Sequence, residues 1–119
     1  MRDYTKLKIW QKSHQLTLEV YSVSKGFPKA ETYGLTSQMR RSCSSIPANI
    51  AEGCGRGGET ELNRYIVIAM GSANELEYHL LLARDLGYLE QDGYCQILKG
   101  VKEVKQMLTG FSKRLKKGV

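Results

Sequence analysis

The most constraining feature of the chain is a pair of regular hydrophobic repeats in its second half. Apolar residues recur there at alternating steps of three and four. The first repeat comprises Leu62, Ile66, Ala69, Ala73, Leu76, Leu80 and Ala83, and the second comprises Tyr94, Ile97, Val101, Val104, Leu108, Phe111 and Leu115. This rhythm places each set along one side of an α-helix, in the a and d positions of a heptad. We therefore predict helices over about 60–86 and 92–116, each burying its seam against other helices.

The first half of the chain predicts a helix over about 8–25. Its main apolar face comprises Leu16, Val20, Val23 and Phe27. Trp10, Thr17 and Tyr21 form a neighbouring stripe at helical spacing. We expect Gly26-Phe27-Pro28 to end this helix, because proline disfavours helical geometry in the residue before it.

A second helix is predicted to begin near Thr32 or Gly34 and to run to Gly53. Its apolar face comprises Leu35, Met39, Cys43, Ile46 and Ile50. Pro47 lies inside this pattern, where it removes one backbone donor and crowds the carbonyl of Cys43. We expect the helix to be kinked at Pro47 and not broken.

Glycines punctuate the connections between these helices. Gly53 to Gly58 is the most flexible segment and is predicted to be the turn between the second and third helices. Gly87 is suited to end the third helix in a left-handed conformation. Four amphipathic helices with short connections favour an all-α, antiparallel, up-down-up-down four-helix bundle, formed by residues 1–119 as a single domain.

Composition and charge restrict the class of protein further. Hydrophobic residues make up 41% of the 119 residues and charged residues 25%, a globular composition. No apolar run approaches the roughly 20 residues of a membrane span, and the start of the chain has no signal-peptide core. We expect a cytoplasmic protein with no membrane contact. Three cysteines cannot all pair within one chain, so Cys43 and Cys95 are interpreted as small packing residues.

The net charge of +6 is distributed unevenly along the chain. Residues 59–89 are net acidic, whereas the other segments are net basic. Arg40 and Arg41 are adjacent in the second helix, and the C-terminal candidates are Lys113, Arg114, Lys116 and Lys117. These are side chains of the kind that contact phosphates, with no base-reading element beside them. The alternative is a solvated helix end whose lysines complement the helix dipole.

The glycine-rich turn matches the dinucleotide-binding spacing at Gly53-x-Gly55-x-x-Gly58. We reject that function, because the fingerprint operates between a strand and a helix, and here a helix precedes it. A weaker possibility is that turn amides, the start of the third helix and Arg56 together hold a phosphate.

A polar stripe also follows the second helix. Its members are Gln38, Arg41, Ser45, Asn49, Glu52 and Arg56. One interpretation is a hydrogen-bonded network at a helix or subunit interface, built from Gln38, Asn49 and Glu52 with Glu75 as a partner from the third helix. A ligand-facing groove and plain solvent exposure are the alternatives.

No residue pattern predicts catalysis or metal binding. His14 and His79 are isolated, and neither has a second ligand at metal-binding spacing. His14, near Trp10, is interpreted as a boundary residue. No Glu-x-x-His pair, nucleophile elbow or Walker loop is present. We expect a non-enzymatic protein with no metal and no cofactor.

Longer motifs resemble a known family. The most specific is Ser45-Ile46-Pro47-Ala48-Asn49-Ile50-Ala51-Glu52-Gly53-x-Gly55-Arg56. The matching pieces around it are Leu7-x-Ile9-Trp10-Gln11-Lys12-Ser13-His14, Phe27-Pro28-Lys29-x-Glu31-x-Tyr33-Gly34-Leu35, Gln38-x-Arg40-Arg41, Ile68-Ala69-x-Gly71-Ser72-x-x-Glu75-Leu76-Glu77 and Leu86-Gly87-Tyr88. Together they resemble the bacterial four-helix-bundle proteins named for reading frames in intervening sequences of 23S ribosomal RNA genes.

The resemblance implies an antiparallel four-helix bundle without enzymatic activity. Members of this family are similar to the accessory variability determinant of diversity-generating retroelements, a pentameric, positively charged barrel that associates with nucleic acid and a reverse transcriptase. Some members are described as ribosomal proteins. Arg40, Arg41 and Arg56 are carried over as motif arginines. The resemblance thus implies a homo-oligomer, with a pentamer expected.

Three functional hypotheses follow. The first is a homo-oligomer that binds RNA or DNA mainly through phosphate contacts, with affinity that falls steeply as salt is added. The second is a protein–protein interaction scaffold, with a reverse transcriptase or another protein as partner. The third is a small-molecule site along the polar stripe of the second helix.

Overall fold

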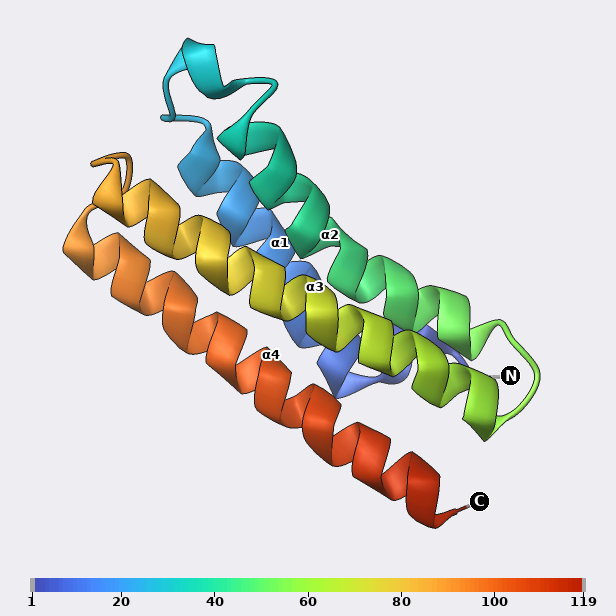
Figure 1. The fold of residues 1–119 in the computed structure, drawn as a ribbon. Helices are drawn as coiled ribbons and strands as arrows, with labels where there is room; N and C mark the ends of the chain where they lie inside the picture. Colours follow the sequence, from blue (N-terminus) through green and yellow to red (C-terminus); the bar gives the residue numbers. More distant parts are fainter. Residues whose placement is uncertain (1, 119) are drawn as a thin grey trace.

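Four helices account for most of the chain in the computed structural model, which describes residues 2–118. They are α1 (Lys8–Ser24), α2 (Leu35–Cys54), α3 (Glu59–Asp85) and α4 (Gln91–Lys117). Two short 3-10 helices, Tyr4–Lys6 and Lys29–Glu31, precede α1 and α2. Successive helices run in alternate directions (Figure 1), and residues 2–118 contain no strand. The prediction of an all-α four-helix bundle is confirmed.

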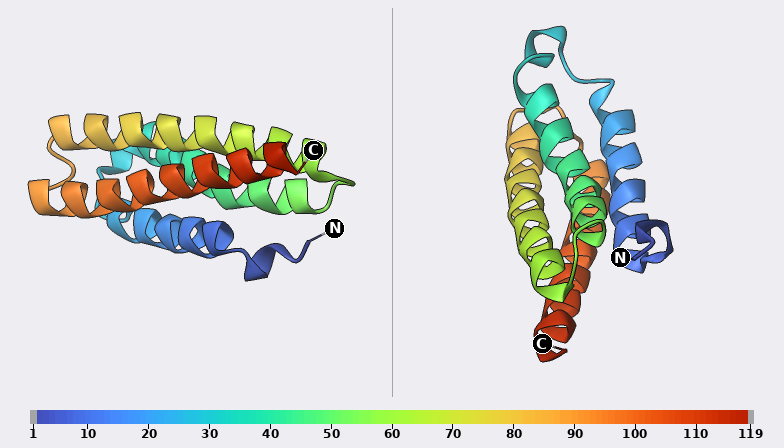
Figure 2. Two further views of the ribbon diagram at one scale, coloured as in Figure 1. Left: turned by 90° about the horizontal axis from the view of Figure 1, so that it is seen from below. Right: turned by 90° about the vertical axis from the view of Figure 1, so that its right-hand side faces the viewer.

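The four helices pack as a closed ring of neighbours in a rod of 46 × 23 × 20 Å. α2 contacts α1 and α3, and α4 contacts α3 and α1. α1 and α3 are therefore diagonal to each other, as are α2 and α4 (Figure 2). Side chains on α2 and α4 that point outward consequently lie on different sides of the rod.

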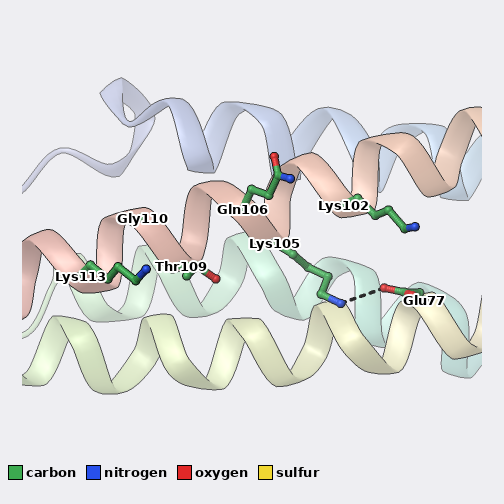
Figure 3. Close-up of a pocket in the computed structure, with 7 residues that line it drawn as sticks. All are labelled: Glu77, Lys102, Lys105, Gln106, Thr109, Gly110 and Lys113. Atoms are coloured by element: carbon green, nitrogen blue, oxygen red, sulfur yellow. Dashed lines mark hydrogen bonds and ion pairs between the residues drawn. The ribbon is translucent and has the colours of Figure 1, made fainter.

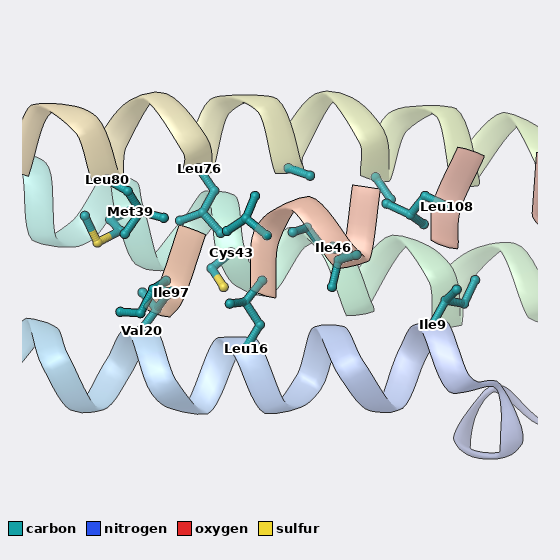
Figure 4. Packing of buried hydrophobic residues seen from close by; sticks show 14 of the residues in the cluster. Ile9, Leu16, Val20, Met39, Cys43, Ile46, Leu76, Leu80, Ile97 and Leu108 are labelled. Atoms are coloured by element: carbon teal, nitrogen blue, oxygen red, sulfur yellow. The ribbon is translucent and has the colours of Figure 1, made fainter. Parts of the chain in front are cut away.

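The predicted heptad seams form the core. Every member of both repeats is buried, from Leu62 to Ala83 in α3 and from Tyr94 to Leu115 in α4. Leu16 and Val20 of α1 and Met39 of α2 point into the same interior (Figure 4). Truncation of a buried leucine or isoleucine to alanine typically lowers the free energy of unfolding by about 2–5 kcal/mol. Burial of these seams is therefore a main source of the stability of the fold.

α2 differs from its predicted bounds at both ends. It begins at Leu35, because residues 29–31 form a separate 3-10 helix and Gly34 has a non-helical backbone (φ −109°, ψ −115°). It continues unbroken through Pro47 and ends at Cys54. The absence of a break is as expected, while the kink at Pro47 stays a prediction.

Two glycines adopt left-handed backbone conformations at the predicted turns. Gly58 (φ 100°) precedes α3, and Gly87 (φ 82°) follows it. The Gly87 amide donates to the Arg84 carbonyl and the Tyr88 amide donates to the Ala83 carbonyl, both at 2.9 Å. These two bonds form a Schellman motif, so Gly87 ends α3 as the sequence predicts.

Glu31 fastens the two loops at one end of the rod. Its carboxylate accepts hydrogen bonds from the Leu35 amide (3.1 Å) and from the Tyr88 hydroxyl (3.0 Å). A Cβ atom at Gly34 would lie 2.7 Å from the Glu31 Oε1 atom, so a side chain there would displace the carboxylate. Phe27 packs against Tyr88 with ring centroids 5.6 Å apart. The loop before α2 and the turn before α4 are thus joined.

The cysteines divide between interior and surface. Cys43 is fully buried, as predicted, and burial raises the pKa of its thiol to about 11. The prediction that Cys95 is also a packing residue is wrong, because Cys95 is exposed. It lies one residue beyond Tyr94, on the side of α4 that faces away from the core. Cys54, which we assigned to the flexible turn, is buried at the end of α2.

Within the described residues, none of the helices has both the length and the apolar character required to cross a membrane.

Candidate nucleic-acid interface

The acidic residues of α3 all have a basic partner. Four of them form ion pairs with lysine or arginine: Glu59 with Arg2 (2.6 Å), Glu61 with Arg64 (3.3 Å), Glu77 with Lys105 (2.9 Å) and Asp85 with Arg84 (3.0 Å). Glu75 lies 3.8 Å from the Nε2 atom of His79. Arg64 and Arg84 belong to this segment themselves, so Arg2 and Lys105 are the partners that offset its net negative charge from outside.

A row of lysines follows the outer side of α4. We call it the lysine ridge: Lys99, Lys102, Lys105, Lys113, Lys116 and Lys117. Apart from Lys105, none of these lysines lies within 4.0 Å of a carboxylate in residues 2–118. Since a helix rises 1.5 Å per residue, the ridge is about 27 Å long. Its positive charge falls into two groups on one helix, residues 99–105 and 113–117, separated by neutral residues.

A shallow depression of about 540 Å³ lies beside the ridge. Its lining residues are Glu77, Lys102, Lys105, Gln106, Thr109, Gly110 and Lys113. Lys105 reaches across to Glu77, whereas Lys102 and Lys113 extend separately on either side of it (Figure 3). The neutral side chains of Gln106 and Thr109 lie between them and can donate hydrogen bonds. An extended anionic chain fits such a surface better than a small ligand, because the depression is open and its cations are spread along it.

The predicted tail residues belong to the same helix. Lys113, Lys116 and Lys117 are exposed members of the ridge. The Arg114 guanidinium lies 5.6 Å from the centre of the Phe111 ring and is also exposed. The last turn of α4 therefore contains a dense group of basic side chains, where the negative end of the helix dipole favours them.

The three motif arginines lie in three different environments. Arg40 bridges α2 to α1, since its Nε donates to the Ser24 hydroxyl (2.8 Å) and its guanidinium covers the Tyr21 ring at 4.6 Å. Arg56 pairs with Glu52 (2.8 Å), a bond that raises the pKa of Arg56. Arg41 is exposed and forms no side-chain hydrogen bond or ion pair within residues 2–118.

Arg41 faces a second depression, of about 450 Å³, between α2 and α3. Its lining residues are Gln38, Arg41, Ser42, Ser45, Ser72 and Glu75. Because α2 and α4 are diagonal, this depression lies on a different side of the rod from the lysine ridge. The structure thus separates Arg41 from the tail lysines.

The glycine-rich turn is a poor phosphate cradle. Glu59 and Glu61 occupy the first turn of α3, and Arg2 pairs with Glu59 at the same place. Two carboxylates at the start of a helix repel a phosphate there. Arg56, the expected cation of this site, is already bound to Glu52.

The comparisons with known proteins place the chain in a family. The model of a family described as the 23S rRNA-intervening sequence protein matches residues 5–110. The chain belongs to this family. It is also similar to a crystal structure of a protein of unknown function from the S23 ribosomal protein family of Bacteroides thetaiotaomicron. The two share 25% sequence identity and a TM-score of 0.79, over 88% of this chain and 98% of the other. None of the curated proteins compared with the chain matches it.

The most specific motif of the 23S rRNA-intervening sequence proteins lies at the α2–α3 contact in this chain. A Cβ atom at Gly53 would lie 2.9 Å from the Leu62 Cδ1 atom and 2.9 Å from the Tyr65 Cβ atom. Only glycine therefore allows α2 to approach α3 this closely. The Asn49 amide donates to the carbonyl and hydroxyl of Ser45 (2.8 and 3.0 Å), and Ser45 shares a 2.7 Å hydrogen bond with Ser72 of α3.

Of the four residues of the expected polar network, Gln38 and Glu75 line the same depression in this family member, whereas Asn49 and Glu52 are bonded elsewhere. Asn49 is bonded toward α3 through Ser45, and Glu75 lies beside His79. Glu52 pairs with Arg56 at the end of α2. Gln38 is exposed and forms no side-chain hydrogen bond in the described part of the chain.

A buried hydrogen bond that the sequence analysis missed joins α2 to α3. The Ser42 hydroxyl lies 3.1 Å from the His79 Nδ1 atom, and both residues are 4% exposed. Burial lowers the pKa of His79, and Glu75 only partly opposes this shift. His79 was treated as isolated because its partner lies 37 positions away, beyond the reach of a spacing argument.

The sequence analysis also missed three lysines of the ridge: Lys99, Lys102 and Lys105. The signal was available for Lys99 and Lys102, because the predicted seam of α4 leaves them on the outward side of the helix, whereas Lys105 lies at the edge of α4 that faces α3. His14 lies at the surface as predicted, with its ring stacked on Trp10 at 4.9 Å. Among residues 2–118, no three His, Cys, Asp or Glu side chains form a group that could hold a metal ion.

Proposed function

We propose that this 23S rRNA-intervening sequence protein is a non-enzymatic, homo-oligomeric, cytoplasmic protein that binds nucleic acid through phosphate contacts. The observation that carries this proposal is the lysine ridge of α4. Its exposed ammonium groups form a band of charge whose members, other than Lys105, have no described carboxylate partner. Displacement of counterions by such lysines supplies affinity that depends weakly on sequence and strongly on salt.

Several features favour a phosphate contact over base reading. The ridge contains lysine and no arginine, and lysine binds phosphate as a point charge without the bidentate geometry that recognises guanine. Between its two groups of lysines, the outer side of α4 has the neutral side chains of Gln106 and Thr109 and the bare backbone of Gly110. RNA is the first probe to test, because the family's description refers to ribosomal RNA.

The test compares two variants that lose the same charge. In the first, Lys102, Lys113 and Lys116 are replaced by alanine. In the control, Lys6, Lys8 and Lys29 are replaced, which are exposed and outside the ridge. Binding to a random-sequence RNA is followed by fluorescence anisotropy at low salt. We expect the ridge variant to lose at least tenfold in affinity and the control to lose much less. Equal losses, or no binding by the unmodified protein, would contradict the proposal.

Self-association is supported by the outer face of α3. Val67, Ile68 and Tyr78 are 52%, 42% and 58% exposed, and the exposed Gly71 lies among them. A surface helix normally presents charged residues outward, so this face is suited to contact another protein surface. A second copy of the chain is our proposed occupant, in a pentamer as the family resemblance implies.

A charge on this face tests the assembly. Val67→Lys leaves the core unchanged, because the side chain already points to solvent. We expect the native mass to fall toward the 13.4 kDa of one chain. Gln106→Lys on α4 is the matched control and should keep the mass of the unmodified protein.

The alternative function is a protein–protein scaffold that does not bind nucleic acid. The same α3 face favours it, with a reverse transcriptase or another protein as the partner. Under this alternative, neither the unmodified protein nor the ridge variant binds RNA. Val67→Lys then abolishes capture of a recurring protein partner.

A further inference from the structure

A row of aromatic side chains follows the outer side of α1. We call it the aromatic ladder: Tyr4, Trp10, His14 and Tyr21. The last three recur at helical spacing, so they share a side of α1. The Tyr4 ring meets the Trp10 ring edge-on at 5.0 Å, and the His14 ring stacks on Trp10 at 4.9 Å with an angle of 8° between the planes. Trp10 and His14 thus form a parallel pair, with Tyr4 against the edge of Trp10 and Tyr21 further along the helix.

The ladder continues to a fixed guanidinium group. Arg40 of α2 covers the Tyr21 ring at 4.6 Å, and its hydrogen bonds to the Ser24 hydroxyl and the Tyr21 carbonyl hold it there. Arginine planes stack on bases as aromatic rings do, and they add positive charge. Lys25 is exposed one turn beyond Tyr21. The end of the ladder thus combines flat surfaces with cations.

α1 fills the interior mainly from another side, and of the ladder residues only Trp10 packs against the edge of the core. α1 fills the core with Ile9, Leu16 and Val20, on the side that faces the other helices. His14 is exposed, Tyr21 is 41% exposed, and Leu18 between them is 51% exposed. Exposed aromatic and aliphatic side chains gathered on one side of a helix are suited to contact another molecule.

The geometry points to the aromatic ladder as a stacking surface for the unpaired bases of a single-stranded nucleic acid, an inference that rests on the function proposed above. Each base presents the same flat face to an aromatic ring, so stacking adds affinity without reading sequence. In a duplex the flat faces are covered by neighbouring base pairs. The ladder therefore distinguishes single strands from duplexes, which the lysine ridge alone does not.

The position of the ladder also favours a single strand over a duplex. Arg40 reaches Tyr21 from α2, so the ladder lies on the α2 side of α1, whereas Lys105 pairs with Glu77 on the α3 side of α4. A molecule that touches both surfaces must bend around a rod about 20 Å thick. A single strand bends on this scale, whereas a duplex is stiff over about 150 base pairs.

Trp10 is the sole tryptophan of the chain and reports on the ladder directly. The probes are oligothymidylate and the same strand annealed to oligoadenylate. We expect the single strand to quench the emission of Trp10 and to bind more tightly than the duplex. We also expect the double variant His14→Ala, Tyr21→Ala to lose about fivefold or more in affinity for the single strand, the lower end of what one stacked contact contributes.

Two control variants separate stacking from other effects. Tyr33→Ala removes a tyrosine that is 96% exposed and lies in the loop before α2, so it should bind like the unmodified protein. Tyr21→Phe keeps the ring and should keep the affinity. The helical circular dichroism of each variant verifies that it is folded.

Two results would overturn the inference while the proposed function stands. In the first, the single strand binds in a ridge-dependent manner, yet Trp10 emission is unchanged and the double variant binds normally. In the second, Trp10 emission changes with protein concentration alone, which makes the ladder an interface between copies. If neither probe binds at all, the inference fails, and the binding of random-sequence RNA decides the proposed function separately.

Discussion

Ser42 Oγ and His79 Nδ1 lie 3.1 Å apart in the interior of the α2–α3 contact, which ties one turn of each helix to the other. The contact is completed by the Ser45–Ser72 hydrogen bond one turn further along α2. A buried imidazole at this position gives the stability of the fold a dependence on pH.

We predict that the free energy of unfolding falls as the solution becomes acidic. Burial lowers the pKa of His79 in the folded protein below its ordinary value of 6.5. The unfolded chain therefore binds a proton more readily, so stability is fully present above the ordinary pKa and is lost as pH falls through the folded pKa. Urea unfolding midpoints between about pH 7.5 and 5.5 measure the effect. His79→Gln should flatten the profile in this window, and an unchanged slope in that variant would contradict the assignment.

Gly53 sets the distance between α2 and α3 and should not tolerate a methyl group. Gly53→Ala places Cβ 2.9 Å from carbon atoms of Leu62 and Tyr65, and we expect a loss of about 1–2 kcal/mol in the free energy of unfolding. Gly93→Ala in α4, outside the α3 face proposed for self-association, is the matched control. Its Cβ would meet nothing within 4 Å, and alanine favours a helix, so stability should rise by up to about 1 kcal/mol. Thermal unfolding of both variants provides the comparison.

The adjacent arginines of α2 should differ in their effect on stability. Arg40→Ala removes a hydrogen bond to Ser24 and the cover of the Tyr21 ring, and we expect it to lower the free energy of unfolding by about 1–2 kcal/mol. Arg41→Ala removes an exposed side chain that has no bonded partner among the described residues, so the change should stay within about 0.5 kcal/mol. Chemical unfolding measures both, and equal effects would mean that the Arg40 contacts contribute nothing.

The salt dependence of RNA binding should report the number of ridge lysines that contact phosphate. Each contact with a single strand contributes about 0.7 to the slope of log affinity against log salt. Replacement of Lys102, Lys113 and Lys116 by alanine should therefore reduce the slope by about 2. Affinities measured between low and physiological salt give the slope. A weakened variant with the original slope would place the contacts elsewhere.

The fold followed from the sequence because its signals were local. The alternation of threes and fours from Leu62 to Ala83 fixes one side of a helix, and the observed α3 begins and ends within one residue of its predicted bounds. Gly87 likewise acts through its own backbone conformation. The start of α2 was harder to place, because the Glu31 carboxylate that organises the preceding loop bonds Tyr88, far along the chain.

The surface was less predictable than the fold, because charge alone does not reveal pairing. Arg40, Arg41 and Arg56 look alike in sequence, yet one bridges two helices, one is exposed, and one pairs with glutamate. The tail lysines were identified by their density. Lys102 was missed, although it continues the same side of α4, because its neighbours Glu103 and Val101 interrupt the run of charge.

Glu31 has a mechanical consequence for the end of the rod that it fastens. Since one carboxylate bonds both the first amide of α2 and the hydroxyl of Tyr88, a force on either loop is transmitted to the other. Tyr33, two residues from Glu31, is 96% exposed, so a partner that binds Tyr33 also acts, through Glu31 and Tyr88, on the turn between α3 and α4.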